Sequence, residues 1–498
     1  MAALSVYLAA LVVGMTAAYF RFLYRRRREG EPPLVPGNFL LGSGPEFAQH
    51  AVKFLHKCKK TYGDIFTIRL LNQHVTIVMD PHSYENLTKE RRFDFDPIQR
   101  QVNHNVFSFE LVDARKMLSE AGKKVNGRHL HGGMKSFSDN LRNAFDKVTN
   151  LDVNGNVVKT VGEQWGHDGL RTLTSKTIFA ALFYTIFGHG QAQAEFEPQV
   201  FHKSFDVFHK YFNYMWLGLP AKLFPKATKA LQVLCQQPSS EDMLMREGVS
   251  EYIKFATGFM KDNAQSEQDI IGHNLVFLHV NYNTFRLAFW CLYKLLENKK
   301  AYAALAEEIR EFVEDKRVLT TGQKVEILME EFDKLPLLDS FIKETLRITS
   351  GVFMVRYIAE DADFTLESGG TYRCRQGDRV AIYPPAIHMD PEIYEDPEEF
   401  KYDRFVDAKF YKNGQELKHP IIAFGSLCPG KKYSLLQTKW FLMNLINSFE
   451  MELLDGESTI PDVNFYGHEI LPPVHDVQVR YRLLENSHEL DLVSKRSC

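Results

Sequence analysis

The spacing of apolar residues along the chain predicts a fold built mainly from helices. Between about Asp269 and Asp315, apolar side chains recur at helical spacing, and this is the strongest helical pattern in the sequence. A second helical pattern runs from about Tyr433 to Phe449. Extended structure is indicated in fewer places, namely Asp64 to Met79, Asp363 to Glu367, Arg379 to Tyr383 and Asp476 to Leu484. We therefore expect a mainly α fold with a minor β-sheet.

The amino-terminal segment has the pattern of a membrane helix. Nineteen residues without a charge, Ala2 to Phe20, would span the ~30 Å hydrocarbon core of a bilayer at ~1.5 Å per helical residue. Arginines follow at once, at Arg21 and from Arg25 to Arg28, and such a cluster stays on the cytosolic side. A cleaved secretory signal is the alternative, but it normally carries its positive charge before the apolar run. We expect a single-pass anchor over residues 1–20, with the rest of the chain facing the cytosol.

The remaining chain shows no internal division. Residues 21–37 are basic and then rich in proline, which favours a stiff, extended linker. No repeat, low-complexity tract or Gly/Ser connector follows, so residues 38–484 are expected to form one domain. Residues 485–498 are mainly polar, and we expect this tail to fray into solvent.

Composition and charge exclude several classes of protein. The 498 residues include 60 Lys and Arg against 63 Asp and Glu, a net charge of −3, so no basic excess indicates a nucleic-acid-binding protein. With 45% hydrophobic residues, the chain is too apolar to be disordered. The six cysteines include no Cys-x-x-Cys pair, which argues against a disulfide scaffold and a zinc ribbon and favours a reducing compartment.

Three motifs in the carboxy-terminal half are weak individually but informative in their order. Glu344 and Arg347 would share one face of a helix, as an ion pair or as part of an ordinary solvated face. A turn-rich acidic stretch then ends at Arg404 between aromatic residues, a pattern that also fits a surface loop. Finally, Cys428 precedes a helix, whose positive amino-terminal potential favours thiolate, the form that ligates metals. A cysteine alone is more often a small core residue.

Taken together, these motifs resemble the cytochrome P-450 family of haem-thiolate monooxygenases over nearly the whole chain. Several segments are similar to the branch that holds the cholesterol and oxysterol 7α-hydroxylases, the sterol 12α-hydroxylase and prostacyclin synthase. These segments are Gly30 to Leu34, Tyr62 to Thr67, Asp80 to Tyr84, Phe400 to Phe405 and His475 to Arg482. The resemblance implies the family's mainly helical fold with a minor sheet and one bound haem, preceded here by a single membrane helix.

The resemblance assigns roles to individual residues. Cys428 would be the axial thiolate ligand of the haem iron, with Phe424 packed near the proximal face of the haem. Arg356 would offer its guanidinium to a haem propionate. A buried charge network behind the haem would contain Glu344, Arg347 and Arg404.

The same resemblance places a polar pair beside the oxygen site. Asn283 and Thr284 fall where the family has an acid or amide followed by a threonine, and their side chains would relay protons, which is a positioning role. The pair matches the 7α-hydroxylases, whereas prostacyclin synthase, which isomerises a peroxide, lacks that threonine. The alternative is that polar residues in the middle of a helix merely satisfy one another.

Two features depart from the family's pattern. Only Gly425 to Leu427 separate Phe424 from Cys428, so the ligand loop is three residues shorter than usual, and we expect strain where it must hold the sulfur. Tyr282 stands where the family usually has glycine or alanine. Its phenol would crowd the oxygen site or donate a new hydrogen bond.

These assignments predict an enzyme that uses O2 to hydroxylate a sterol or oxysterol, in the manner of a 7α-hydroxylase of cholesterol or bile acid metabolism. Electrons would come from NADPH through a flavoprotein reductase docked on Lys431, Lys432 and Lys439, unless these lysines form an ordinary solvated helix face. The expected location is the endoplasmic reticulum membrane. Two alternatives stay open: a lipid endoperoxide isomerase of the prostacyclin synthase type, which needs no reductase, and a non-catalytic haem- or sterol-binding remnant.

Overall fold

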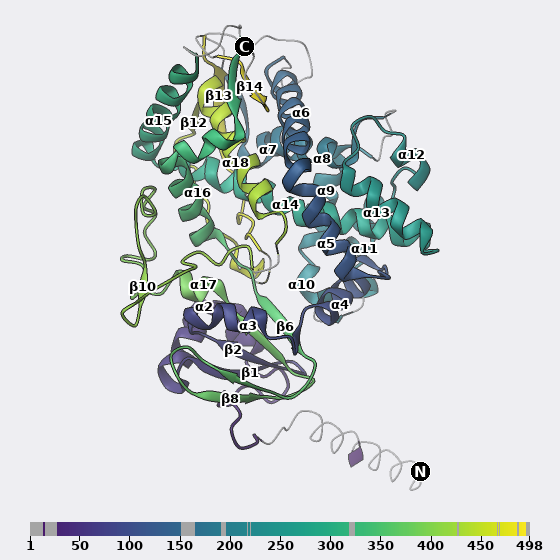
Figure 1. The fold of residues 1–498 in the computed structure, drawn as a ribbon, viewed down its shortest axis with the longest axis vertical. Coiled ribbons are helices and arrows are strands. Elements are labelled where there is room, and N and C mark those ends of the chain that lie inside the picture. Colours follow the sequence, from purple (N-terminus) through teal and green to yellow (C-terminus); the bar gives the residue numbers. More distant parts are fainter. Residues whose placement is uncertain are drawn as a thin grey trace. The chain divides into compact units, whose positions relative to one another are not determined.

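The structure is a computed structural model in which the chain forms two compact units. It describes residues 13–14, 27–150, 165–190, 196–216, 218–219, 221–317, 324–425, 428–465, 467, 469–485 and 488–494. The first unit comprises residues 1–98, 353–393 and 411–419, and the second comprises residues 99–352, 394–410 and 420–498. Figure 1 traces both units along the sequence.

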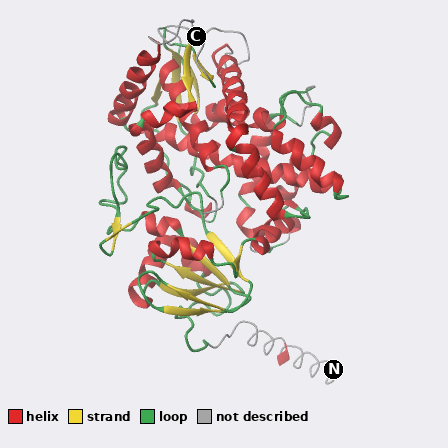
Figure 2. Ribbon diagram, in the orientation of Figure 1, coloured by secondary structure: helices red, strands yellow, loops and turns green. Residues whose placement is uncertain are grey.

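The first unit contains a five-stranded sheet with the order β1-β2-β9-β6-β3 (Figures 1 and 2). Strands β2 and β9 run parallel, and the other neighbours run antiparallel. The strands of this unit are β1 (Ile65–Leu70), β2 (Gln73–Val78), β3 (Phe93–Asp94), β6 (Met354–Ile358), β7 (Ala362–Thr365), β8 (Thr371–Cys374), β9 (Arg379–Ile382), β10 (Tyr411–Lys412) and β11 (Gln415–Glu416). Its helices are α2 (Gly44–Tyr62), η1 (Pro81–Ser83), α3 (Tyr84–Lys89) and α17 (Pro384–His388). Nearly every residue of β1 and β2 is buried, which accounts for the dense apolar cluster in this part of the sequence.

The second unit is mainly helical (Figure 2). Its α-helices are α4 (Asp96–Phe107, which begins at the end of the first unit), α5 (Ala114–Val125), α6 (Leu130–Asn150), α7 (Leu170–Thr174), α8 (Ala180–Phe187), α9 (Pro198–His209), α10 (Phe212–Trp216), α11 (Pro225–Leu234), α12 (Ser240–Leu244), α13 (Glu251–Asp262), α14 (Glu267–Glu297), α15 (Lys299–Arg317), α16 (Pro336–Thr349) and α18 (Lys431–Ser448). Shorter helical turns are η2 (Gly127–His129), η3 (Ser175–Phe179), η4 (Ala221–Leu223), η5 (Met329–Lys334) and η6 (Val463–Phe465). Small sheets are formed by β4 (Gly166–Gly169), β5 (Val325–Leu328), β12 (Phe449–Leu453), β13 (Gln478–Leu483) and β14 (Leu490–Val493).

The long helix α14 begins with a capping box and is buried along most of its length. The hydroxyl of Ser266 accepts a hydrogen bond from the Asp269 amide (3.2 Å), and the Asp269 carboxylate accepts one from the Ser266 amide (3.1 Å). The sequence pattern predicted one helical stretch from Asp269 to Asp315, but the structure breaks it at Asn298. The Asn298 side chain accepts from the amide of Ala301 (3.0 Å) and so begins a new helix, α15.

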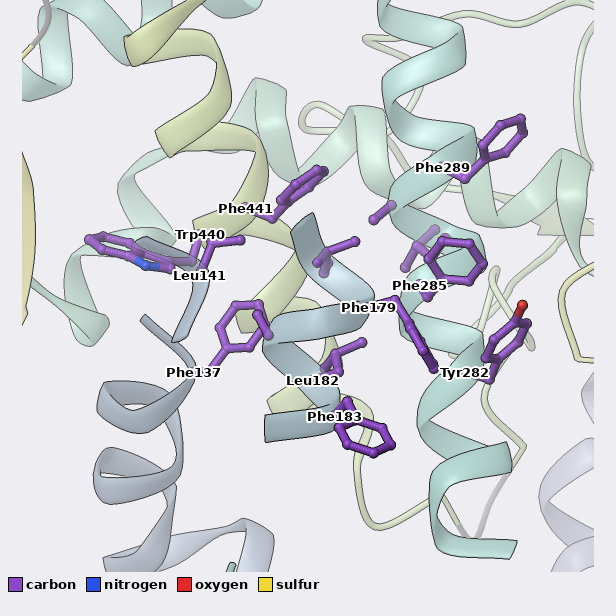
Figure 3. Close-up of a cluster of buried hydrophobic side chains, with 14 of the residues drawn as sticks. Phe137, Leu141, Phe179, Leu182, Phe183, Tyr282, Phe285, Phe289, Trp440 and Phe441 are labelled. Atoms are coloured by element: carbon purple, nitrogen blue, oxygen red, sulfur yellow. The ribbon is translucent and has the colours of Figure 1, made fainter. Parts of the chain in front are cut away.

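A cluster of buried side chains fixes α14 against its neighbours (Figure 3). The labelled members are Phe137 and Leu141 of α6, Phe179 of η3, Leu182 and Phe183 of α8, Tyr282, Phe285 and Phe289 of α14, and Trp440 and Phe441 of α18. The ring of Phe179 packs against two α14 rings, with centroid distances of 5.4 Å to Tyr282 and 5.7 Å to Phe285. Edge-to-face pairs of this kind contribute about 0.5–1.5 kcal/mol beyond the burial of their area. Packing of apolar and aromatic side chains therefore fixes the position of α14.

The chain beyond β13 is not a frayed tail in the described residues. Strand β14 runs parallel to β5, with Leu490 opposite Val325 and Leu492 opposite Ile327, and all four side chains are buried. The prediction of a solvated polar tail is therefore wrong for residues 488–494. Two leucines separated by Asp491 are enough to give a strand one buried face, because side chains alternate along a strand.

The predicted fold class, mainly α with a minor sheet, is confirmed in the described residues. Strands also occupy all four of the predicted extended segments, near residues 64–79, 363–367, 379–383 and 476–484. The predicted anchor over residues 1–20 lies outside the described residues, apart from Val13 and Gly14. Across the part of the chain that is described, none of the helices combines the length and apolar character needed to cross a membrane. The boundaries of the anchor, linker and catalytic domain stay predictions.

Candidate functional site

Cys428 lies just before the amino terminus of α18. The residue is exposed, yet desolvation of its sulfur by the surrounding atoms raises the pKa of the Cys428 thiol above its usual value. The backbone amides of Gly430 and Lys431 donate toward the sulfur and lower that pKa. These amides, together with the positive end of α18, would stabilise a thiolate. Ser426 and Leu427 lie outside the described residues, so the expected strain in the shortened loop stays a prediction.

The segment after Cys428 is held by the end of α5. The side-chain amide of Asn126 donates to the carbonyl of Pro429 (2.6 Å) and to the carbonyl of Gly122 (3.0 Å). A Cβ atom at Gly122 would lie 3.4 Å from the Cβ atom of Pro429, so this contact leaves little space for a side chain. Asn126 therefore joins two parts of the sequence that are about 300 residues apart.

Glu344, Arg347 and Arg404 form one buried charge network. Arg347 donates from Nε to Glu344 Oε2 (2.7 Å) and from a terminal nitrogen to Oε1 (2.8 Å), and both side chains are fully buried. Arg404 Nε donates to the same Oε1 atom (3.0 Å). The carbonyls of Pro397 and Glu399 accept further hydrogen bonds from Arg347. This pair is therefore not a solvated helix face, and the dense hydrogen bonding offsets the cost of burying the charges.

Thr284 and Asn283 do not act together in this structure. Thr284 is buried and its hydroxyl lies 2.8 Å from the hydroxyl of Ser434 on α18. Asn283 is only partly buried and its side chain donates back to the carbonyl of Val280 on the same helix (3.2 Å). Ser434 had no signal in the sequence, because a serine in a helix carries no local pattern that indicates its partner.

Tyr282 contacts α7 and α9, whereas Thr284 contacts α18. The Tyr282 hydroxyl, visible in Figure 3, donates to Asp206 Oδ1 (2.7 Å) and lies 2.8 Å from Nδ1 of His202. Asp206 also forms an ion pair with Arg171. The new hydrogen bond expected of this phenol therefore exists, and crowding of the Thr284 side of α14 does not occur. Residues two apart on a helix point in nearly opposite directions.

Burial and neighbouring charges together set the charge states of the side chains around Tyr282. Burial would raise the pKa of Asp206, but the nearby Arg171 guanidinium outweighs it and holds that pKa below its usual range. Burial lowers the pKa of His202 to about 4, so this imidazole is neutral at pH 7. The sequence did not indicate Arg171, His202 or Asp206, because they meet Tyr282 only through the packing of three separate helices.

A second group of hydrogen-bonded polar side chains lies further along α14. Arg286 donates to the carbonyl of Ile470 (3.1 Å) and to Nδ1 of His209 (3.1 Å). Since Arg286 is always a donor, His209 must carry its proton on Nε2 and donate to Nδ1 of His279 (3.0 Å). Burial lowers the pKa of Arg286 to about 10 and that of His279 to about 4. This part of α14 is therefore a buried, hydrogen-bonded cluster of polar side chains.

The other predicted cofactor contacts are placed as follows. Arg356 lies on β6 in the first unit, is 6% exposed, donates to the carbonyl of Val355 (3.0 Å) and stacks over the ring of Phe95 (4.9 Å to the centroid). Burial lowers the pKa of Arg356. Phe424 is partly buried in the second unit, and the Lys431 ammonium lies 5.8 Å from its ring centroid.

The predicted basic surface after Cys428 is only partly correct. Lys431 and Lys432 are exposed at the start of α18. Lys439, by contrast, is 6% exposed and pairs with Asp339 of α16 (2.9 Å). The helix turns this third lysine inward, so it does not belong to a docking surface.

Comparisons with known proteins bear directly on these assignments. The family model for cytochrome P450 matches residues 32–249 and 283–475. The cholesterol 7-alpha-monooxygenase of Cricetulus griseus is 28% identical over 486 residues, which cover 92% of this chain and 95% of the relative. The 5-beta-cholestane-3-alpha,7-alpha-diol 12-alpha-hydroxylase of Sus scrofa is 31% identical over 487 residues, which cover 93% of this chain and 95% of the relative.

A solved structure has the same fold. It is described as retinoic acid bound cyanobacterial CYP120A1, and it superposes with a TM-score of 0.65 at 20% sequence identity over 91% of this chain and 99% of that chain. The family model matches more than half of this chain. The chain therefore belongs to the cytochrome P450 family, whose members are monooxygenases that hold a haem iron through a cysteine thiolate.

Proposed function

We propose that this protein is a membrane-anchored monooxygenase that hydroxylates a sterol or oxysterol, in the manner of a 7α-hydroxylase. The observation that carries the proposal is the position of Cys428, an exposed residue whose sulfur faces two backbone amides at the start of α18. The relatives support the substrate class, because their names refer to cholesterol and to a cholestane diol.

The residues present fit a haem in their chemistry. Cys428 supplies a sulfur donor; burial raises its thiol pKa, and the amides of Gly430 and Lys431 at the helix amino terminus oppose that rise. Phe424 would pack against the proximal face of the haem, and the guanidinium of Arg356 suits a propionate. When bound, the haem supplies the iron at which O2 is activated for insertion of one oxygen atom into a C–H bond.

The chain's own residues would then position groups and hold protons. The Thr284 hydroxyl would hold a proton for transfer, with Ser434 fixing its orientation through the 2.8 Å contact. Asn283 would assist once its side chain turns away from the carbonyl of Val280. The network of Glu344, Arg347 and Arg404 would keep the segment around residues 395–404 in place behind the haem.

The remaining parts of the proposal concern the membrane and the electron donor. The uncharged stretch followed by arginines supports a single-pass anchor in the endoplasmic reticulum membrane, with the catalytic domain in the cytosol. Electrons would come from NADPH through a flavoprotein reductase. Lys431 and Lys432 are exposed and would attract an acidic reductase surface.

Reconstitution of the purified full chain with haem tests this function. We expect the reduced, carbon-monoxide-bound protein to show the absorbance band of a thiolate-ligated haem, and to hydroxylate a sterol only when reductase and NADPH are both added. A protein that binds no haem would refute the proposal and leave a non-catalytic remnant. A normal band without sterol turnover would refute the substrate assignment alone.

One observation favours a second candidate, a lipid endoperoxide isomerase. The Thr284 hydroxyl is engaged with Ser434, and an isomerase needs no proton relay, reductase or free O2. Rearrangement of an endoperoxide in the absence of NADPH would support this candidate. Dependence of sterol turnover on the reductase would exclude it.

A further inference from the structure

A cavity of about 370 Å³ lies within the second unit, among α5, α6, α8, α13, α14 and α18. These helices are labelled in Figure 1. Its lining includes neither Cys428 nor Thr284, so it is separate from the residues given roles above. The volume falls in the lower part of the range of small-molecule sites, ~300–1,000 Å³. Apolar side chains, including Val125, Leu182 and Phe277, form much of its wall.

The cavity carries an excess of positive charge. Its lining contains three cations, Lys124, Arg128 and Lys254, and one carboxylate, Glu251. Lys254 is neutralised by Glu251, with 2.8 Å between Nζ and Oε1. Lys124 and Arg128 form no ion pair with any carboxylate of the described residues; Arg128 instead donates to His129. The lining therefore retains two positive charges that a ligand can neutralise.

A buried amide also lines the cavity. Gln437 of α18 is 1% exposed, and neither its amide nitrogen nor its amide oxygen has a hydrogen-bond partner among the described residues. The phenol of Tyr433 lies one turn away and interacts with this amide, but not in hydrogen-bonding geometry. An amide left unpaired in an apolar interior is destabilising, and a ligand with a hydroxyl group would relieve this by pairing with it.

We propose that this cavity binds an amphipathic organic anion. Its carboxylate or sulfate group would lie against Lys124 and Arg128, its apolar body would contact the wall around Phe277, and an uncharged hydroxyl group would pair with Gln437. The site is independent of the haem chemistry, since none of these side chains belongs to the proposed haem-binding residues.

Binding of 12-hydroxydodecanoate to the full chain, measured by isothermal titration calorimetry, tests the proposal. This probe has a carboxylate at one end, a hydroxyl at the other and an alkyl chain between them. Dodecanoate lacks only the hydroxyl, and 1,12-dodecanediol lacks only the charge. We expect the hydroxy acid to bind more tightly than either analogue.

Matched variants locate the binding. The double variant Lys124→Gln/Arg128→Gln should weaken binding of the hydroxy acid by about tenfold or more, because charge-assisted hydrogen bonds are lost. Lys123→Gln removes the same charge from the neighbouring position, which does not line the cavity, and should leave the affinity unchanged. Gln437→Leu should abolish the preference for the hydroxy acid over dodecanoate.

Three results would overturn the proposal. They are equal affinity for the diol and the hydroxy acid, unchanged affinity in the double variant, and displacement of the probe by imidazole, which binds ferric haem. A preparation without haem would contradict the proposed function, but the same titration would still decide whether the cavity binds the anion.

Discussion

Removal of the Glu344 carboxylate should destabilise the protein strongly. In the Glu344→Ala variant, Arg347 keeps its two carbonyl partners but loses its counter-ion while fully buried, and Arg404 loses the same partner. Glu344 Oε1 alone accepts three hydrogen bonds, from Arg347, Arg404 and the backbone amide of Lys401. Breaking a buried ion pair from one side costs about 3–5 kcal/mol. We expect a decrease of that size in the free energy of unfolding.

Urea unfolding of the full chain, followed by intrinsic fluorescence, measures this decrease. The matched control is Glu307→Ala, which removes the partner of Arg310 from an exposed pair with the same three-residue spacing on α15. Exposed pairs contribute about 0.2–1 kcal/mol, so the control should change little. If Glu344→Ala loses no more stability than the control, the network does not hold this part of the fold and the reasoning is refuted.

Three further predictions concern the thiolate, the loop and pH. Cys428→Ser should abolish the thiolate band of the reduced carbon-monoxide complex, whereas Cys235→Ser should retain it; an unchanged band in the first variant would exclude Cys428 as ligand. Insertion of three residues before Leu427 should raise haem occupancy, measured as the ratio of haem to protein absorbance; no rise would mean that the short loop is tolerated. Burial lowers the pKa of His273 to about 4, below its unfolded value of ~6.5, so its stabilising contribution is present above pH 6.5 and is lost as pH falls toward 4. His273→Gln should weaken this acid dependence in urea unfolding, and an identical pH profile would contradict it.

The sequence was most informative where a pattern is local. The three-residue spacing of Glu344 and Arg347 indicated a shared helix face, and the position of Cys428 before a helical pattern indicated a helix amino terminus. Both depend on residues close together in the chain, and the structure has both features. The order of the motifs extended the prediction to Arg404, which donates a hydrogen bond to the carboxylate of Glu344, 60 residues earlier in the chain.

Other features depend on contacts that no local pattern records. We expected Lys439 to be exposed like Lys431 and Lys432. It lies instead on the inward face of the helix, where it pairs with Asp339. The phenol of Tyr282 could be singled out as unusual, but its partner Asp206 lies on another helix, 76 residues earlier in the chain. Such pairings arise from tertiary packing, and no local pattern in a single sequence predicts them.

The pairing of β14 with β5 has a consequence for how the protein is made. The two strands begin 165 residues apart, at Val325 and Leu490, and β14 follows every other described strand and helix. Because a ribosome delivers the chain from its amino terminus, β5 leaves the exit tunnel long before its partner exists. During that interval its backbone edge can pair with strands of other nascent chains. Recombinant expression should therefore be sensitive to translation speed and chaperone supply, and shortening the gene before the codon for Leu490 would make the open edge permanent.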